Sequence, residues 1–96
     1  MNVKEMASKY ILKTERVLED MVRTRRLTVE DEDVTEVVEE AKRYLEDAKF
    51  YLERGMAETS LASVSYAEGL LDSLRMLGLL EFSWRNREVR MDERER

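Results

Sequence analysis

The sequence predicts an all-α fold, an antiparallel up-down-up bundle of three helices over residues 1–82 with a charged C-terminal tail over 83–96. Three observations support this class. Apolar side chains recur at three- and four-residue spacings through three segments. The chain contains no proline to interrupt a helix. Glycine or clustered acids mark the breaks between the segments, as expected of helix ends. Ninety-six residues suffice for one domain with one modest core.

The first helix is expected from about Val3 to Arg25, with one apolar face about 160° wide. Leu12 stands alone on the opposite, charged face. Three arginines near the end, Arg23, Arg25 and Arg26, would favour the negative end of the helix dipole. We expect the apolar face to pack on the two helices that follow. Its members are Val3, Met6, Ala7, Tyr10, Ile11, Thr14, Val17, Leu18, Met21 and Val22.

The second helix is expected over residues 30–54, with Thr28 as its N-cap and Gly55 as its stop signal. The acidic run from Glu30 to Asp33 falls in the first turn, where negative charge favours the positive end of the helix dipole. Four consecutive acids could also bind a hard cation, but the run lacks the alternating ligands and turn glycine of an EF-hand. We therefore interpret the run as a helix start.

The third helix is expected from about Ala57 to Leu80 and carries few charges. Its small residues would allow another backbone to approach closely, and we expect it to be the most buried of the three. Its polar side chains form a narrow stripe of Glu68, Asp72 and Arg75. Asp72 and Arg75 are spaced to pair on the helix surface.

The chain offers little catalytic chemistry. It has no histidine and no cysteine, so the commonest general base and the thiolate nucleophile are both absent. The remaining candidates form a possible polar cluster, Asp47 with Glu68, Asp72 and Arg75. Because two of these acids lie one turn apart on a solvated stripe, we expect them to be surface groups. The sequence thus predicts no enzyme, no catalytic residue, no cofactor and no metal.

Some apolar residues fall outside the predicted core and are candidates for a partner surface. Phe50 lies among charged residues of the second helix, Met76 and Leu80 widen the apolar surface of the third, and Trp84 begins the tail. Exposed apolar side chains that cluster in this way can mark an interaction site. We expect the tail to be partly disordered, with order fading after Trp84.

The hairpin of the second and third helices carries a recognisable pattern. It resembles a family of short archaeal proteins catalogued as domain of unknown function 357. The resemblance covers about residues 9–80 and is most specific in the hairpin. The matching positions are Lys9, Tyr10, Thr14, Glu15, Leu18, Ala41, Tyr44, Glu46, Asp47, Ala48, Phe50, Leu52, Gly55, Ser65, Tyr66, Ala67, Gly69, Leu71, Asp72, Leu77 and Gly78.

This chain departs from the family pattern at three positions. The pattern places a histidine before Gly69 and an aromatic residue after it, where this chain has Glu68 and Leu70. It also places an acid after the turn glycine, where this chain has Met56. Any chemistry of that histidine is absent here. The resemblance implies a three-helix bundle and no assigned function.

The leading hypothesis is a non-enzymatic interaction module that binds a protein partner or a second copy of itself. The alternative is an accessory RNA-binding protein that uses terminal arginines with Trp84 as a stacking platform. The net charge of −5 disfavours that alternative. The arginines concerned are Arg23, Arg25, Arg26, Arg85, Arg87 and Arg90.

The composition also bears on location. No apolar run approaches the roughly 20 residues of a membrane-spanning helix, and the charged first residues do not resemble a secretory signal. We therefore expect a cytoplasmic protein without a membrane partner. High glutamate and arginine with few amides and no cysteine is typical of thermophile proteins.

Overall fold

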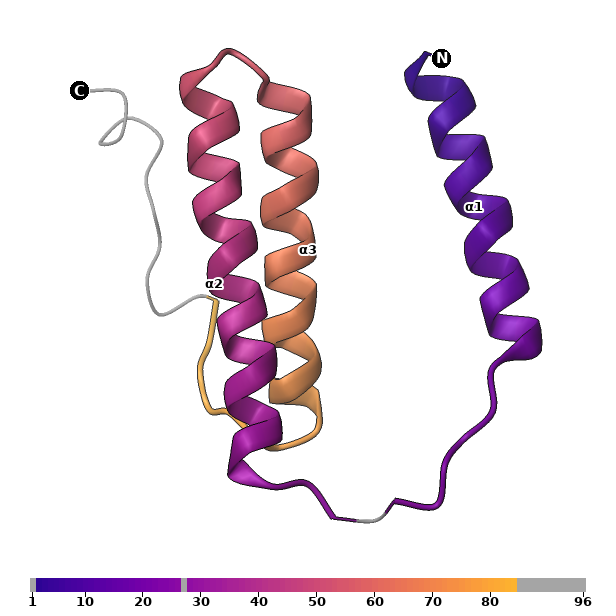
Figure 1. Cartoon of the computed structure of the whole chain (residues 1–96), viewed down its shortest axis with the longest axis vertical. Coiled ribbons are helices and arrows are strands. Elements are labelled where there is room, and N and C mark those ends of the chain that lie inside the picture. Colours follow the sequence, from indigo (N-terminus) through magenta and orange to yellow (C-terminus); the bar gives the residue numbers. More distant parts are fainter. Residues whose placement is uncertain (1, 27, 85–96) are drawn as a thin grey trace.

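The described part of the chain consists of three α-helices and the segments that join them. The computed structural model describes residues 2–26 and 28–84. Helix α1 spans Val3–Asp20, α2 spans Asp31–Glu53 and α3 spans Ala57–Met76. Consecutive helices run in opposite directions (Figure 1). The predicted all-α class with three helices in up-down-up order is confirmed.

Helices α2 and α3 form a tight hairpin around Gly55. This glycine has a φ of 76°, in the left-handed region that side chains other than glycine rarely adopt. The amide of Met56 donates to the carbonyl of Tyr51 at 2.9 Å, and the amide of Gly55 donates to that of Leu52 at 3.1 Å. These two bonds are the Schellman closure of a helix C-terminus. The sequence predicted this stop correctly.

Small side chains let the two helices of the hairpin approach closely. The buried apolar residues are Ala41 and Ala48 of α2 with Ala67 and Leu74 of α3. The buried hydroxyl of Ser60 donates to the carbonyl of Ala48 at 2.7 Å, which ties α3 to α2 across the interface. Three of the four buried apolar residues are alanines, so the core of the hairpin is narrow and close-packed.

Helix α1 lies apart from this hairpin (Figure 1). No Cα atom of α1 comes within 8 Å of one in α2 or α3, and none of its residues is buried. The prediction that α1 packs on the hairpin therefore differs from the structure, in which the packed core belongs to α2 and α3. The radius of gyration is 16.4 Å, against roughly 12.5 Å for a compact domain of this length.

The ends of α1 differ in how far local sequence determines them. At the start, the side chain of Asn2 accepts a hydrogen bond from the amide of Glu5 at 2.8 Å, which is an N-cap. At the other end the helix stops at Asp20, not at Arg25 as predicted. Met21 takes an extended conformation, and Val22 and Thr24 that follow are β-branched and weak helix formers. Without tertiary contacts, nothing holds these residues in a helix.

The three arginines of the predicted last turn therefore lie in the connection between α1 and α2. Arg26 forms an ion pair with Asp33, in the first turn of α2. The carboxylate of Asp33 also accepts a hydrogen bond from the backbone amide of Glu30 at 2.8 Å. Glu30, not Thr28, is thus the N-cap residue of α2. The acidic run begins the helix as predicted, with its cap two residues later than expected.

A second glycine closure ends α3 earlier than predicted. Gly78 has a φ of 77°, the amide of Leu79 donates to the carbonyl of Leu74 at 2.9 Å, and the amide of Gly78 donates to that of Arg75 at 2.9 Å. The helix therefore ends at Met76 rather than at Leu80. The chain then turns back along the hairpin as far as Trp84 (Figure 1). The prediction for the tail beyond Trp84 lies outside the described residues.

Candidate functional site

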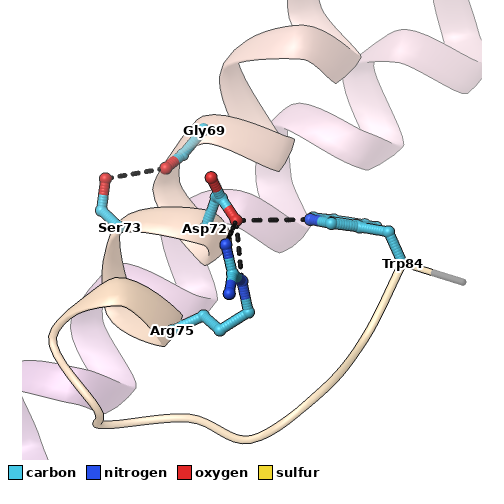
Figure 2. Close-up of polar contacts among 5 residues, drawn as sticks. All are labelled: Gly69, Asp72, Ser73, Arg75 and Trp84. Carbon is cyan, nitrogen blue, oxygen red and sulfur yellow. Dashed lines mark hydrogen bonds and ion pairs between the residues drawn. The ribbon is translucent and has the colours of Figure 1, made fainter.

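The returning segment is held by a polar cluster at the C-terminal end of α3 (Figure 2). One carboxylate oxygen of Asp72 accepts from Arg75 Nε at 2.9 Å and lies 2.8 Å from a second guanidinium nitrogen of Arg75. The same oxygen accepts from the indole Nε1 of Trp84 at 3.4 Å. Asp72 thus joins a helical neighbour to a residue 12 positions further along the chain.

Aromatic contacts support the same attachment. The rings of Phe82 and Trp84 meet edge to face, with centroids 4.9 Å apart. The guanidinium carbon of Arg75 lies 6.0 Å from the centroid of Phe82, within the range of a cation–π contact. Arg75 therefore contacts both the carboxylate of Asp72 and the returning segment.

Asp72 is held in its charged form by these donors. The hydrogen bond from Arg75, and after it the bond from Trp84, lowers the pKa of Asp72 below its ordinary value of 3.8. A carboxylate with a lowered pKa is a poor general acid near neutral pH. The cluster is therefore suited to attachment of the segment rather than to proton transfer.

Acid should release the returning segment through Asp72. A lowered pKa in the attached state means that the contribution of Asp72 is complete above pH 3.8 and is lost as the pH falls through its lowered value. Trp84, the one tryptophan of the chain, reports this release by its fluorescence. We expect a reversible emission change in acid that Asp72→Asn removes. Glu68→Gln, one turn away, should retain it, and an unchanged transition in Asp72→Asn would contradict the assignment.

The predicted polar cluster is only partly assembled. Asp72 and Arg75 pair as expected, and Glu68 lies one turn before Asp72 on the same side of α3. Asp47 lies on α2, and within the described residues no hydrogen bond or ion pair joins it or Glu68 to the other two. Sequence reasoning did not foresee Trp84 as the third member, because a contact 12 residues away depends on how the chain turns at Gly78.

One side of the hairpin, which we call the tyrosine face, is apolar and partly exposed. The rings of Tyr44 and Tyr66 meet across the two helices with centroids 4.5 Å apart, and Tyr66 is 48% exposed. The other members of this face are half-buried. The face consists of Val37, Tyr44 and Tyr51 of α2 with Tyr66 and Leu70 of α3.

Two open grooves carry opposite charge. The first follows α2 near the tyrosine face and is lined by Asp31, Glu32, Thr35, Glu36, Val37, Glu39, Glu40, Arg43 and Leu70. The second follows one edge of α1 and is lined by Lys9, Leu12, Lys13, Arg16, Val17, Asp20 and Met21. Helical-wheel positions of the charged residues could have revealed both edges from the sequence.

The chain was compared with known proteins. A family model described as a protein of unknown function (DUF357) matches residues 3–80. The chain belongs to the DUF357 family. No curated protein and no solved structure matches it. The match extends over all three helices and the turn at Gly78, so α1 is part of the family pattern although it packs on neither other helix.

The predicted partner surface of this DUF357 protein is spread over both ends of the hairpin. Phe50 is exposed near the Gly55 turn, where the guanidinium of Arg54 lies 4.3 Å from its ring centroid. Met76 is exposed at the opposite end, and Leu80 is half-buried in the returning segment. Trp84 is about half exposed while its indole donates to Asp72. These four residues do not form one continuous patch around Phe50.

The remaining candidate residues also have positions in the structure. Arg23 and Arg25 are exposed in the connection before α2, and Arg26 pairs with Asp33. Arg85, Arg87 and Arg90 of the RNA hypothesis lie outside the described residues. Among the described residues, no three acidic side chains converge on a point that could hold a metal ion. In the same residues, no helix is both long and apolar enough to cross a membrane.

Proposed function

We propose that this DUF357 protein is a small, non-enzymatic helical module that works by binding another protein surface, on a different protein or on a second copy of itself. The observation that carries the proposal is the exposure of α1. Its apolar stripe covers the length of an 18-residue helix, yet every residue of that helix is exposed. An isolated amphipathic helix gains little stability by itself and depends on packing of its apolar face.

The size of this exposed stripe distinguishes it from ordinary surface leucines. Tyr10, Val17 and Leu18 are each more than half exposed, and Met6 and Met21 continue the stripe toward both ends of α1. Scattered apolar residues need no explanation, whereas a continuous apolar surface usually marks an interaction site. The stripe is thus best understood as one half of an interface.

The polar chemistry supports a non-enzymatic role. The chain has no histidine or cysteine. Its most organised carboxylate, Asp72, is engaged by Arg75 and Trp84. As part of the same proposal the module works in the cytoplasm, which a chain without disulfide-forming cysteines fits.

A matched pair of leucines on α1 tests the proposal. Leu18 lies on the apolar stripe and is 62% exposed, while Leu12 lies on the charged face and is 49% exposed. We expect Leu18→Lys to weaken association at least about tenfold, because a charge placed in an apolar interface is costly to desolvate. Leu12→Lys should leave association unchanged. Sedimentation velocity over a range of concentrations, together with affinity capture on immobilised protein, measures both variants.

One control and one contradicting outcome make the result interpretable. Far-UV circular dichroism should show the same hairpin in both variants, because α1 contributes nothing to the hairpin core. A strictly monomeric protein that retains no partner, with Leu18→Lys and Leu12→Lys behaving alike, would show that the exposed stripe is not an interface.

A further inference from the structure

We propose that two copies of this protein exchange their α1 helices, each α1 lying on the tyrosine face of the other copy's hairpin. This inference rests on the proposed function and names the partner as a second copy. Three observations carry it: the match between the two apolar surfaces, the complementary charges along their edges, and the position of α1 away from its own hairpin.

The apolar surfaces lie on helices of similar length. Helix α1 presents its stripe over 18 residues, about 27 Å of helix axis. The tyrosine face follows the valley between α2 and α3, helices of 23 and 20 residues. A third helix placed along this valley would cover the exposed ring of Tyr66 and the half-buried Tyr44 and Leu70. Both apolar surfaces would then be removed from water together.

The charges along the edges are complementary. Lys9, Lys13 and Arg16 follow each other at four- and three-residue spacings along one edge of the α1 stripe. On α2, an acidic row of Asp33, Glu36, Glu40 and Asp47 borders the tyrosine face at spacings of three, four and seven. Asp33 pairs with Arg26 and Glu40 with Arg43. Glu36 and Asp47 have no ion pair within the described residues.

The handedness of the helices fixes how these edges meet. If α1 lies on the tyrosine face antiparallel to α2, its basic edge falls on the α2 side, against the acidic row. The net charges of the two parts of the chain agree with this placement. Residues 2–26 hold seven bases and four acids, whereas residues 28–84 hold five bases and fourteen acids. Opposite charge of this kind selects the partner and its orientation.

The partner is a second copy because one chain carries both complementary surfaces and holds them apart. Met21 and Glu30, which flank α1 and α2, are both extended, and α1 lies away from the hairpin (Figure 1). The Arg26–Asp33 ion pair fixes the connection between these helices at the start of α2. In a twofold exchange each copy gives α1 and receives one, so the interface is self-complementary as symmetric dimers require.

Cysteine cross-linking of the full-length chain tests the exchange, because the natural chain has no cysteine. A Lys13→Cys copy is mixed with a Glu40→Cys copy, and a short bismaleimide links thiols that lie close together. Exchange predicts a linked dimer of one copy of each kind. Lys42→Cys, on the opposite side of α2 at a similar height, is the matched control and should lose this product.

The outcomes separate this inference from the proposed function. A dimer by sedimentation that gives no Lys13–Glu40 link would overturn the exchange and leave self-association standing. A monomer in which the doubly substituted chain links internally would show that α1 closes on its own hairpin, and would also overturn it. A monomer with no link, whose Leu18→Lys variant behaves like the natural chain, would count against both.

Charge reversal gives a second, independent readout. Lys13→Glu and Glu36→Lys should each raise the dissociation constant of the dimer about tenfold through like-charge contacts, and the double variant should recover most of the loss. Glu46→Lys, on the outer side of α2, should have little effect. Equal effects of Glu36→Lys and Glu46→Lys would contradict the proposed edge.

Discussion

Leu74→Ala is expected to destabilise the hairpin by about 2–4 kcal/mol, the usual cost of truncating a buried leucine when the cavity does not collapse. Leu74 is 5% exposed and is the one large apolar side chain among the buried residues of the described part of the chain. The other buried apolar residues there are alanines, which cannot reorganise to fill a cavity. A small core rarely supplies more than about 3–5 kcal/mol, so this variant should keep only a small part of the free energy of unfolding.

Urea denaturation followed by circular dichroism measures this effect, at one fixed protein concentration because self-association would add to the apparent stability. Leu61→Ala is the matched control, since Leu61 lies on the same helix and is 66% exposed. The control should change the free energy of unfolding by no more than about 0.5 kcal/mol. Equal losses in the two variants would show that the core is not where the structure places it.

Ala67→Leu is the second change with a large expected effect, of about 1–3 kcal/mol. Ala67 is 4% exposed in the interface with α2, where Ala41 and Ala48 are buried as well. A leucine at this position must push the helices apart or adopt a strained rotamer. The separation would also disturb the contact between the rings of Tyr44 and Tyr66.

Thermal unfolding and tyrosine near-UV dichroism together measure the outcome for Ala67→Leu. Ala62→Leu is the control, because Ala62 lies on an exposed side of α3 and leucine is nearly as good a helix former as alanine. We expect a lower melting temperature and an altered near-UV signal for Ala67→Leu alone. A stability gain in Ala67→Leu would mean that the interface has room for a larger side chain.

Much of the fold follows from signals within a few residues along the chain. The apolar spacings predicted three helices, and Gly55 predicted the turn of the hairpin. The pairing of Asp72 with Arg75 was expected because residues three apart share a helix face. Such features depend on neighbours in sequence, so one sequence is enough to predict them.

The candidate site was predictable only in part. Asp72 and Arg75 were expected to be a solvated surface pair, and their contact with Trp84 was missed. Asp47 was expected on the second helix and lies on α2, and within the described residues no hydrogen bond or ion pair joins it to Asp72 or Arg75. The contact with Trp84 and the position of Asp47 relative to α3 both depend on which separate segments lie together in space. Helical spacing within one segment does not predict this.

The sequence by itself determined the presence of three helical segments, the glycine stop at Gly55 and the polar stripe of α3, because these are local properties of the backbone and of helix periodicity. Only the tertiary structure decided that α1 stands apart and ends at Asp20, and that the returning segment attaches Trp84 to Asp72. The physical reason is that an apolar stripe in the sequence shows only that one face of a helix is stabilised by packing. Which surface packs against that face depends on how separate segments are arranged in space.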